Sequence, residues 1–312
     1  MLLLLLACTG PAADTALPVD TAPPDDTAVP AAPPDPSSFD CSAAAIPERV
    51  TPIPWACATD VACTERLVAG HRGMGGEQGV IAPENTLSAI RAAIAYGVDF
   101  VETDPRPTAD GVIINLHDTS LARTTDGAGD ADLLTYDEIR AFHILSDRHT
   151  GDFACEYVPT LQEVLLTARG RVHVLVDANK TDRVDLLVAA IQETDTLAEA
   201  IFDTSSPEKI AEALALEPAL HTMIRVESEE ELDSELAGFA AHPPVIVEIP
   251  DTEPELATAV RAAGNRAFID VFFTDAAVVY QEDPSLYGAF YEQGLAIVQS
   301  DRPELVLGWL GR

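Results

Sequence analysis

Residues 67–102 read LVAGHRGMGGEQGVIAPENTLSAIRAAIAYGVDFVE, a stretch with the layout of one strand–helix–strand unit. The runs 67–70 and 98–102 are short and mainly apolar, which is typical of strands buried on both faces of a parallel sheet. The segment between them repeats apolar residues at helical spacing, and Asn85 or Thr86 is placed to cap that helix. The stretch therefore predicts one β–α–β unit.

The same alternation of apolar runs and amphipathic helical stretches continues along the chain. It predicts eight strands, at residues 67–70, 98–102, 172–177, 200–203, 220–225, 245–249, 267–272 and 295–299. Eight such units favour an α/β fold, the TIM (β/α)8 barrel. The run 112–116 follows the turn pair Asp110-Gly111, which predicts a short hairpin insertion after the second strand. A doubly wound open sheet is the alternative, but the chain lacks its glycine-rich phosphate loop.

The composition is strongly acidic. The 312 residues include 52 Asp and Glu against 18 Lys and Arg, a net charge of −34. This balance excludes nucleic acid as a partner, because binding to its backbone depends on clustered Lys and Arg. An anionic membrane surface would also repel the protein. Hydrophobic residues make up 47% of the chain, which is sufficient for a packed core.

The first 40 residues differ in composition from the rest. Leu5-Leu6-Ala7-Cys8 resembles a bacterial lipoprotein cleavage box, so residues 1–8 are predicted to be a lipoprotein-type signal segment. Residues 9–40 repeat Pro, Asp and Thr without a base, and are predicted to form a disordered tether. We expect an exported protein of the bacterial cell envelope or periplasm, held at the membrane only through a lipid on Cys8. The remaining segments are a Cys-containing extension and the barrel, at residues 41–66 and 67–312.

Apart from Cys8, the chain has four cysteines, Cys41, Cys57, Cys63 and Cys155. Four cysteines in an exported protein favour two disulfides, in any of three pairings. Three of the four precede the first predicted strand, so a disulfide to Cys155 could pin the N-terminal segment to a later loop. A zinc site is the alternative, but Cys57 and Cys63 lack the close pairing of such sites and no histidine lies at ligand spacing beside them.

In a TIM barrel the active site lies where strands end and the following loops begin. Glu102 and Asp104, two residues apart at a strand end, would point the same way and repel each other unless a cation lies between them. Asp177, at the end of the third predicted strand, could supply a further ligand, and three carboxylates suit Mg²⁺ or Ca²⁺ better than zinc. His71 and His117 also follow predicted strands, and they are candidates for general acid and base.

Several short motifs of the chain occur together in one known family. In the N-terminal half they are His71-Arg72-Gly73, Ala82-Pro83-Glu84-Asn85-Thr86, Glu102-Thr103-Asp104, Asp110-Gly111, His117-Asp118 and residues 121–127. In the C-terminal half, where the likeness is weaker, they are residues 158–165, Ser206-Pro207-Glu208 and Ser300-Asp301-Arg302-Pro303. With these motifs, residues 67–310 resemble the glycerophosphodiester phosphodiesterases, a family of TIM-barrel enzymes similar to phosphatidylinositol phospholipase C.

The resemblance implies a TIM barrel that hydrolyses glycerophosphodiesters to glycerol 3-phosphate and an alcohol. Carried over to the matching motifs, it makes His71 and His117 the acid and base pair. It also implies that Arg72 contacts the phosphate, and that Glu102 and Asp104 bind one divalent cation, Ca²⁺ or Mg²⁺. The cation and Arg72 would neutralise the charge that builds on the phosphoryl oxygens.

Two positions depart from the family pattern. Where the family has Glu-x-Lys, this chain has Asp177-Ala178-Asn179-Lys180, and Asp177 is kept as a metal ligand because related sphingomyelinase D-like enzymes resemble it there. Lys180, a candidate substrate contact, would point away from the site in a regular strand unless a bulge restores it, and Asn179 would face the site instead. Phe272-Phe273-Thr274-Asp275 replaces a Trp-Thr-x-Asn element, which alters the wall expected to face the substrate.

Two other functions are compatible with these residues. A phospholipase D-like member of the family would act on the headgroups of lysophospholipids or sphingolipids, and apolar loops around the rim would favour it. A surface lipoprotein that only binds a ligand is the alternative from another class. The intact His71, His117, Glu102 and Asp104 argue against that alternative.

Overall fold

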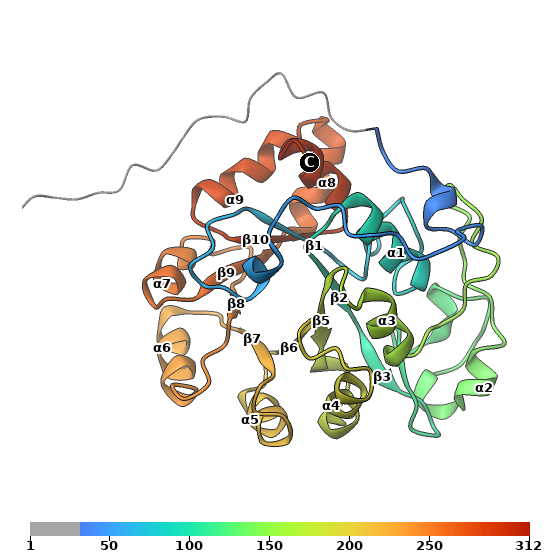
Figure 1. The fold of residues 1–312 in the computed structure, drawn as a ribbon, viewed down its shortest axis with the longest axis horizontal. Helices are drawn as coiled ribbons and strands as arrows, with labels where there is room; N and C mark the ends of the chain where they lie inside the picture. The colour runs from blue at the N-terminus through green and yellow to red at the C-terminus, as the bar shows by residue number, and fades with distance from the viewer. Residues whose placement is uncertain (1–31) are drawn as a thin grey trace, which may run out of the picture.

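The computed structural model describes residues 32–312, and eight parallel strands in it close into a barrel. Each strand pairs with the next barrel strand along the chain, and the last pairs with the first. The barrel strands are β1 (Leu67–Gly70), β2 (Phe100–Thr103), β5 (His173–Asp177), β6 (Ala200–Thr204), β7 (His221–Arg225), β8 (Ile246–Glu248), β9 (Arg266–Asp270) and β10 (Ile297–Ser300). The predicted TIM barrel is confirmed, with its helices arranged around the strands (Figure 1).

The helices between the strands cover the outside of the barrel. They are α1 (Leu87–Tyr96), α3 (Leu161–Ala168), α4 (Val184–Glu193), α5 (Pro207–Leu216), α6 (Glu229–Gly238), α7 (Leu256–Ala262), α8 (Phe272–Gln281), α9 (Gly288–Glu292) and α10 (Pro303–Trp309). In β5, Val174 and Val176 belong to the core shared with these helices, whereas Leu175 belongs to a second core inside the barrel. Because successive side chains point to opposite faces, both faces of the strand are buried, which explains its continuous apolar run.

Helix α1 fixes the segment that precedes it. The side chain of Thr86 accepts a hydrogen bond from the Ala89 N–H, and the helix ends at Gly97, which adopts a left-handed φ of 81°. Thr86 is therefore the cap of the helix. Its neighbour Asn85 is left to interact with the barrel.

The predicted hairpin insertion lies between β2 and β5. Its strands β3 (Pro105–Pro107) and β4 (Ile113–Asn115) pair antiparallel, across a turn in which Gly111 adopts a φ of 80°. The insertion continues through short 3-10 turns and α2 (Tyr136–Ile139). It has a small core of its own, formed by Ile114, Leu116, Leu121, Ala131, Ile139 and Val158.

The four cysteines form two disulfides, as predicted. Cys41 is bonded to Cys155, 114 residues further along the chain, and Cys57 is bonded to Cys63. The first bond pins the N-terminal segment to the insertion, whereas the second closes a local loop. The zinc alternative is therefore wrong, because all four thiols are engaged with one another.

The predicted tether ends earlier than residue 40. Pro36–Ser38 form a 3-10 turn, Phe39 is 1% exposed, and Asp40 accepts a hydrogen bond from the Asp152 N–H over 2.9 Å. The boundary at residue 40 was wrong because Phe39 buries its ring beside α1, a contact that composition does not reveal. The rest of the tether up to residue 31, and the signal segment with Cys8, lie outside the described residues.

Strand bounds agree with the predictions to within two residues. The strand predicted over 267–272 is shorter at its carboxyl end, because β9 ends at Asp270 and α8 begins at Phe272. The carboxylate of Asp270 accepts a hydrogen bond from the Phe272 N–H over 2.9 Å, which turns the chain into the helix. Among residues 32–312, no helix is both long and apolar enough to cross a bilayer.

Candidate active site

Three buried carboxylates lie together at the carboxyl ends of β2 and β5. One oxygen each of Glu102, Asp104 and Asp177 lies within 4.8 Å of the other two. Their exposed fractions are 3%, 1% and 4%. Burial, followed by the charge of Asp104, raises the pKa of Glu102 well above its ordinary value. The predicted cluster is therefore formed, and three carboxylates so close together require a cation or a proton between them.

One side of Asp104 is held by two residues with an unusual backbone. Asn85 Nδ2 donates to Asp104 Oδ2 over 2.8 Å, and Arg72 Nε lies 3.5 Å from the same oxygen. Arg72 and Asn85 have φ angles of 52° and 56°, in the left-handed region. Such a conformation costs about 1–3 kcal/mol at a non-glycine residue and is concentrated at functional sites. The contacts with Asn85 and Arg72 engage Oδ2 of Asp104 and leave Oδ1 for other partners.

His71 follows β1 and lies between two acids. Its Nδ1 is 2.7 Å from Oδ1 of Asp301, and its Nε2 is 3.9 Å from Oε2 of Glu102. Burial disfavours the charged imidazole, but the hydrogen bond to Asp301 and the charges of Asp270 and Glu102 outweigh it and raise the pKa of His71 to about 10. Asp301 was not assigned to the site from the sequence, although it directly follows the last barrel strand, a position that marks site residues in this fold.

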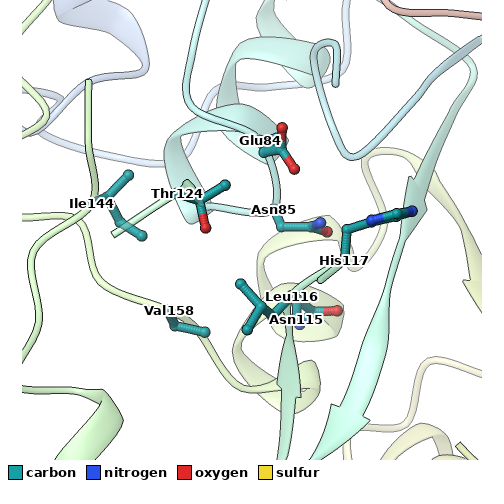
Figure 2. A pocket seen from close by; sticks show the side chains of 8 residues that line it. All are labelled: Glu84, Asn85, Asn115, Leu116, His117, Thr124, Ile144 and Val158. Atoms are coloured by element: carbon teal, nitrogen blue, oxygen red, sulfur yellow. The ribbon is translucent and has the colours of Figure 1, made fainter. Parts of the chain in front are cut away.

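His117 lies two residues beyond β4 and has a carboxylate partner of its own. Its Nδ1 is 2.8 Å from Oδ1 of Asp118, and its carbonyl accepts a hydrogen bond from Arg106 Nη2 over 2.7 Å. Figure 2 shows His117 among the side chains that line a small pocket, together with Glu84 and Asn85. Both predicted histidines therefore engage Nδ1 with an acid and leave Nε2 for another partner.

The chain was compared with known proteins. A model of the glycerophosphoryl diester phosphodiesterase family matches residues 71–283, more than half of the chain. The chain belongs to this family. This membership agrees with the resemblance inferred from the motifs.

Individual relatives match over different lengths. Glycerophosphodiester phosphodiesterase 1 from Bos taurus is 43% identical over 96 residues, which cover 30% of this chain but only 28% of the bovine protein. The structure of a glycerophosphodiester phosphodiesterase from Agrobacterium tumefaciens is 25% identical, covers 77% of this chain and 98% of that chain, and has a TM-score of 0.60. An Oleispira antarctica phosphodiesterase in complex with the product sn-glycerol-3-phosphate is 22% identical over 80% of this chain and 98% of its own, with a TM-score of 0.65, and supports the fold.

In this family member, Lys180 reaches the carboxylate cluster by a route that the sequence did not predict. Residues Ala178–Lys180 form a 3-10 turn instead of a bulge, and Lys180 Nζ lies 3.8 Å from both Asp104 Oδ1 and Asp177 Oδ2. Asn179 Nδ2 donates to Asp177 Oδ1 over 2.6 Å, and Asn179 Oδ1 accepts from the Thr204 hydroxyl over 3.0 Å. Asn179 thus supports the carboxylate of Asp177 and ties it to β6.

The other barrel strands of this family member end in polar residues that the sequence analysis did not assign to the site. They are Asp203, Arg225, Glu248, Asp270 and Gln299. Arg225 Nη2 lies 2.7 Å from Asp203 Oδ2 and Arg225 Nε lies 2.8 Å from Glu248 Oε2. Burial raises the pKa of Glu248 to about 8, despite the charge of Arg225. Asp177 was selected from the sequence because it lies at a strand end. The same criterion would have selected most of these five residues.

Residues 272–275, which differ from the family pattern, contribute to the rim of the barrel and to the residues packed behind it. Phe273, the second residue of α8, has 74% of its surface exposed. Asp275 is fully buried and accepts hydrogen bonds from the Tyr287 and Ser300 hydroxyls and from the Asp301 N–H. Burial raises the pKa of Asp275 to about 7. Asp275 therefore supports Asp301, the partner of His71, from behind.

Proposed function

We propose that this chain is a metal-dependent phosphodiesterase that hydrolyses glycerophosphodiesters to glycerol 3-phosphate and an alcohol. The observation that carries the proposal is the buried cluster of Glu102, Asp104 and Asp177, with His71 3.9 Å from Glu102 and Arg72 3.5 Å from Asp104. The Oleispira relative, whose structure contains sn-glycerol-3-phosphate, supports the same reaction type.

The donor set fits a hard divalent cation. Glu102, Asp104 and Asp177 offer only oxygen ligands, which favours Mg²⁺ or Ca²⁺ over zinc. Burial, and then the charges of Asp104 and Asp177, raise the pKa of Glu102, and such an ion would relieve the repulsion among the three carboxylates. When bound, the ion would supply a positive charge that stabilises negative charge on the phosphoryl oxygens.

The side chains of the protein supply binding and proton transfer. Arg72 donates N–H groups to the phosphate, and Lys180 adds a second positive charge from the 3-10 turn after β5. His71 and His117 act through Nε2, because Nδ1 of each is held by an acid. One histidine removes the proton of the nucleophile, a water or a substrate hydroxyl, while the other protonates the leaving alkoxide.

The disulfides support an exported location. Disulfides persist in oxidising compartments such as the bacterial periplasm. We therefore propose that the protein is exported and held at the cell envelope through a lipid on Cys8. Metabolic labelling with a radioactive fatty acid tests the anchor: wild type takes up label, and Cys8→Ser does not. Equal labelling of both proteins would contradict it.

A phospholipase D-like activity on lysolipids is the second candidate. Phe273 is 74% exposed in the first turn of α8, the helix that follows β9, where an acyl chain could contact it. We expect Phe273→Ser to lower turnover of lysolipid micelles selectively if this candidate holds. Equal effects on micelles and on water-soluble diesters would speak against it.

Turnover by the purified chain tests the main proposal. Glycerophosphocholine, glycerophosphoethanolamine, glycerophosphoglycerol and a lysolipid are each assayed with Mg²⁺, with Ca²⁺ and with a chelator. We expect release of glycerol 3-phosphate that the chelator abolishes. His71→Ala and His117→Ala should lose about 10²–10⁴-fold in rate, while His143→Ala, an exposed histidine also paired with an acid, should retain it.

Each part of the proposal has its own contrary outcome. If wild type and His71→Ala release product at the same background rate, the enzymatic claim is wrong and a ligand-binding lipoprotein is favoured. Activity that resists the chelator would remove the metal assignment alone.

A further inference from the structure

Glu84 and Arg123 are charged residues that the proposed reaction does not use. They connect Arg72 and His117, which it does use. Oε2 and Oε1 of Glu84 accept hydrogen bonds from Arg123 Nη1 and Nη2 over 2.8 and 2.7 Å. Oε1 of Glu84 also accepts from Arg72 Nη1 over 2.9 Å. The other edge of Arg123 donates from Nε to Asp118 Oδ2 over 2.6 Å, and Asp118 Oδ1 lies 2.8 Å from Nδ1 of His117. These five residues are called the ion-pair chain below.

Glu84 is the buried centre of the ion-pair chain. Only 5% of its surface is exposed. Burial alone would raise the pKa of Glu84, but the hydrogen bonds of Arg123 and the charge of Arg72 hold it below its ordinary value. Removing one partner from a buried ion pair is strongly destabilising. The carboxylate of Glu84 is therefore stable in this position when it faces the guanidinium groups of both Arg72 and Arg123.

The ion-pair chain joins three separate segments at the site. Arg72 follows β1, Glu84 precedes α1, and His117 with its two partners belongs to the insertion after β4. Glu84 and His117 line the same small pocket (Figure 2). The placement of His117 relative to the barrel therefore depends on a contact between the insertion and the segment before α1.

We infer that Glu84 and Arg123 are positioning residues that hold the acid-base His117 and the phosphate-binding Arg72 in one fixed arrangement. The inference rests on the proposed function. Arg123 suits this role because its planar guanidinium uses both edges, one for Glu84 and one for Asp118. Lysine carries the same charge but cannot bind both acids in that fork geometry.

The two residues are expected to affect different kinetic constants. Arg123→Ala releases Asp118 and His117 but leaves the contact between Glu84 and Arg72. We therefore expect kcat to fall by about 10²-fold, as for a misplaced reacting group, with little change in KM. Glu84→Gln also removes the charge partner of Arg72, so KM should rise in addition to the loss in kcat.

Steady-state kinetics of the full chain with its best glycerophosphodiester test the inference. The variants are Arg123→Ala, Arg123→Lys, Glu84→Gln, Asp118→Asn and the double variant Asp118→Asn with Arg123→Ala. Arg140→Ala is the matched control, because Arg140 lies in the same insertion and pairs with Glu163 at 3.6 Å, away from the site. Guanidinium ion at millimolar concentration is added to Arg123→Ala, with urea at the same concentration for comparison.

Support requires a loss of kcat in Arg123→Ala that guanidinium, but not urea, partly restores. Arg123→Lys should stay impaired, and the double variant should be no slower than Asp118→Asn alone, because both residues act through His117. Wild-type kcat in Arg123→Ala or in Arg123→Lys overturns the inference and leaves the proposed function intact. A wild-type chain without diester turnover overturns both.

Discussion

At the scale of single residues, the site is defined by charges that the barrel removes from water. Glu102, Asp104 and Asp177 share one buried space, and Lys180 approaches two of them at 3.8 Å. Arg72 Nε also lies 3.5 Å from Asp104, and Arg225 Nη2 lies 3.6 Å from Asp177. The physical reason to expect a divalent cation is that three buried carboxylates converge on one point and offer it only oxygen ligands.

Removal of one carboxylate should weaken cation binding. We expect Asp177→Asn to lower the affinity for Mg²⁺ or Ca²⁺ by at least about tenfold, since the amide keeps the shape of the side chain but loses its charge. Isothermal titration calorimetry measures the change directly. Asp185→Asn is the control, because Asp185 is exposed and pairs with Arg183. Equal affinities in wild type and Asp177→Asn would show that the cluster does not bind the ion.

The pair of His71 and Asp301 should give the metal-free protein a pH-dependent stability. The pKa of His71 in the folded protein is about 10, above the ordinary value of 6.5. The stabilisation by the charged imidazole is therefore complete below pH 6.5 and is lost as pH rises through 10. The free energy of unfolding contributed by His71 should fall by at most about 1.4 kcal/mol per pH unit in that window.

Urea unfolding in the presence of a chelator, at several pH values, isolates this contribution. His71→Asn should lack that part of the decline, whereas His143→Asn, an exposed histidine, should behave like wild type. Parallel pH profiles for wild type and His71→Asn would refute the assignment.

At the scale of elements, the start of α1 links helix stability to the site. The helix is capped by Thr86, whose hydroxyl also donates to the Pro83 carbonyl over 2.7 Å. The two residues before this cap are Glu84 and Asn85, which hold Arg72 and Asp104. A change in the cap should therefore disturb the site without touching any group that contacts substrate.

We expect Thr86→Ala to lower the free energy of unfolding by about 1 kcal/mol, because the Ala89 N–H loses its acceptor. The same variant should lower kcat. Thr86→Ser should retain most of the stability and most of kcat. Ser228→Ala removes the cap of α6 at an exposed position and should cost similar stability with unchanged kcat. Urea unfolding and diester turnover provide the two measurements, and unchanged kcat in Thr86→Ala would contradict the link.

At the scale of the whole molecule, the N-terminal segment clamps the barrel from outside. Cys41 is bonded to Cys155, and the neighbouring Glu156 accepts hydrogen bonds from Ser88 and Arg91 of α1. At the other terminus, Arg312 lies 2.8 Å from Asp99. These contacts join regions far apart in the sequence, and the disulfide, which is covalent, also restricts the unfolded chain.

The two disulfides should therefore differ in their contribution to stability. Loss of the Cys41–Cys155 bond, in the variant with both residues changed to Ser, should lower the free energy of unfolding by about 4–5 kcal/mol in the chain-entropy description. The Cys57–Cys63 bond closes a loop with a separation of only 6 residues. Changing both of these residues to Ser should lower the free energy of unfolding by roughly half as much. Urea unfolding of the two variants without reductant compares them. A larger loss at Cys57 and Cys63 would contradict this account.

Much of the site could be predicted from the sequence because of where its residues stand along the chain. Glu102 and Asp177 are the last or nearly the last residues of apolar runs, and this position alone places them at the carboxyl end of the barrel. Lys180 was harder to place, because the 3-10 turn that redirects it depends on hydrogen bonds of Asp177 and Asn179. The disulfide pairing was also open, since three pairings are compatible with the same four cysteines.

The sequence by itself therefore determined the barrel, the order of its strands and the carboxylates at their ends. These features follow from the period of apolar residues and from covalent neighbourhood, both of which are local. Only the tertiary structure decided that His71 pairs with Asp301, 230 residues away, and that Arg123 joins Glu84 to Asp118. Such partners meet only when the barrel closes and the insertion packs against it, so no local pattern of residues specifies them.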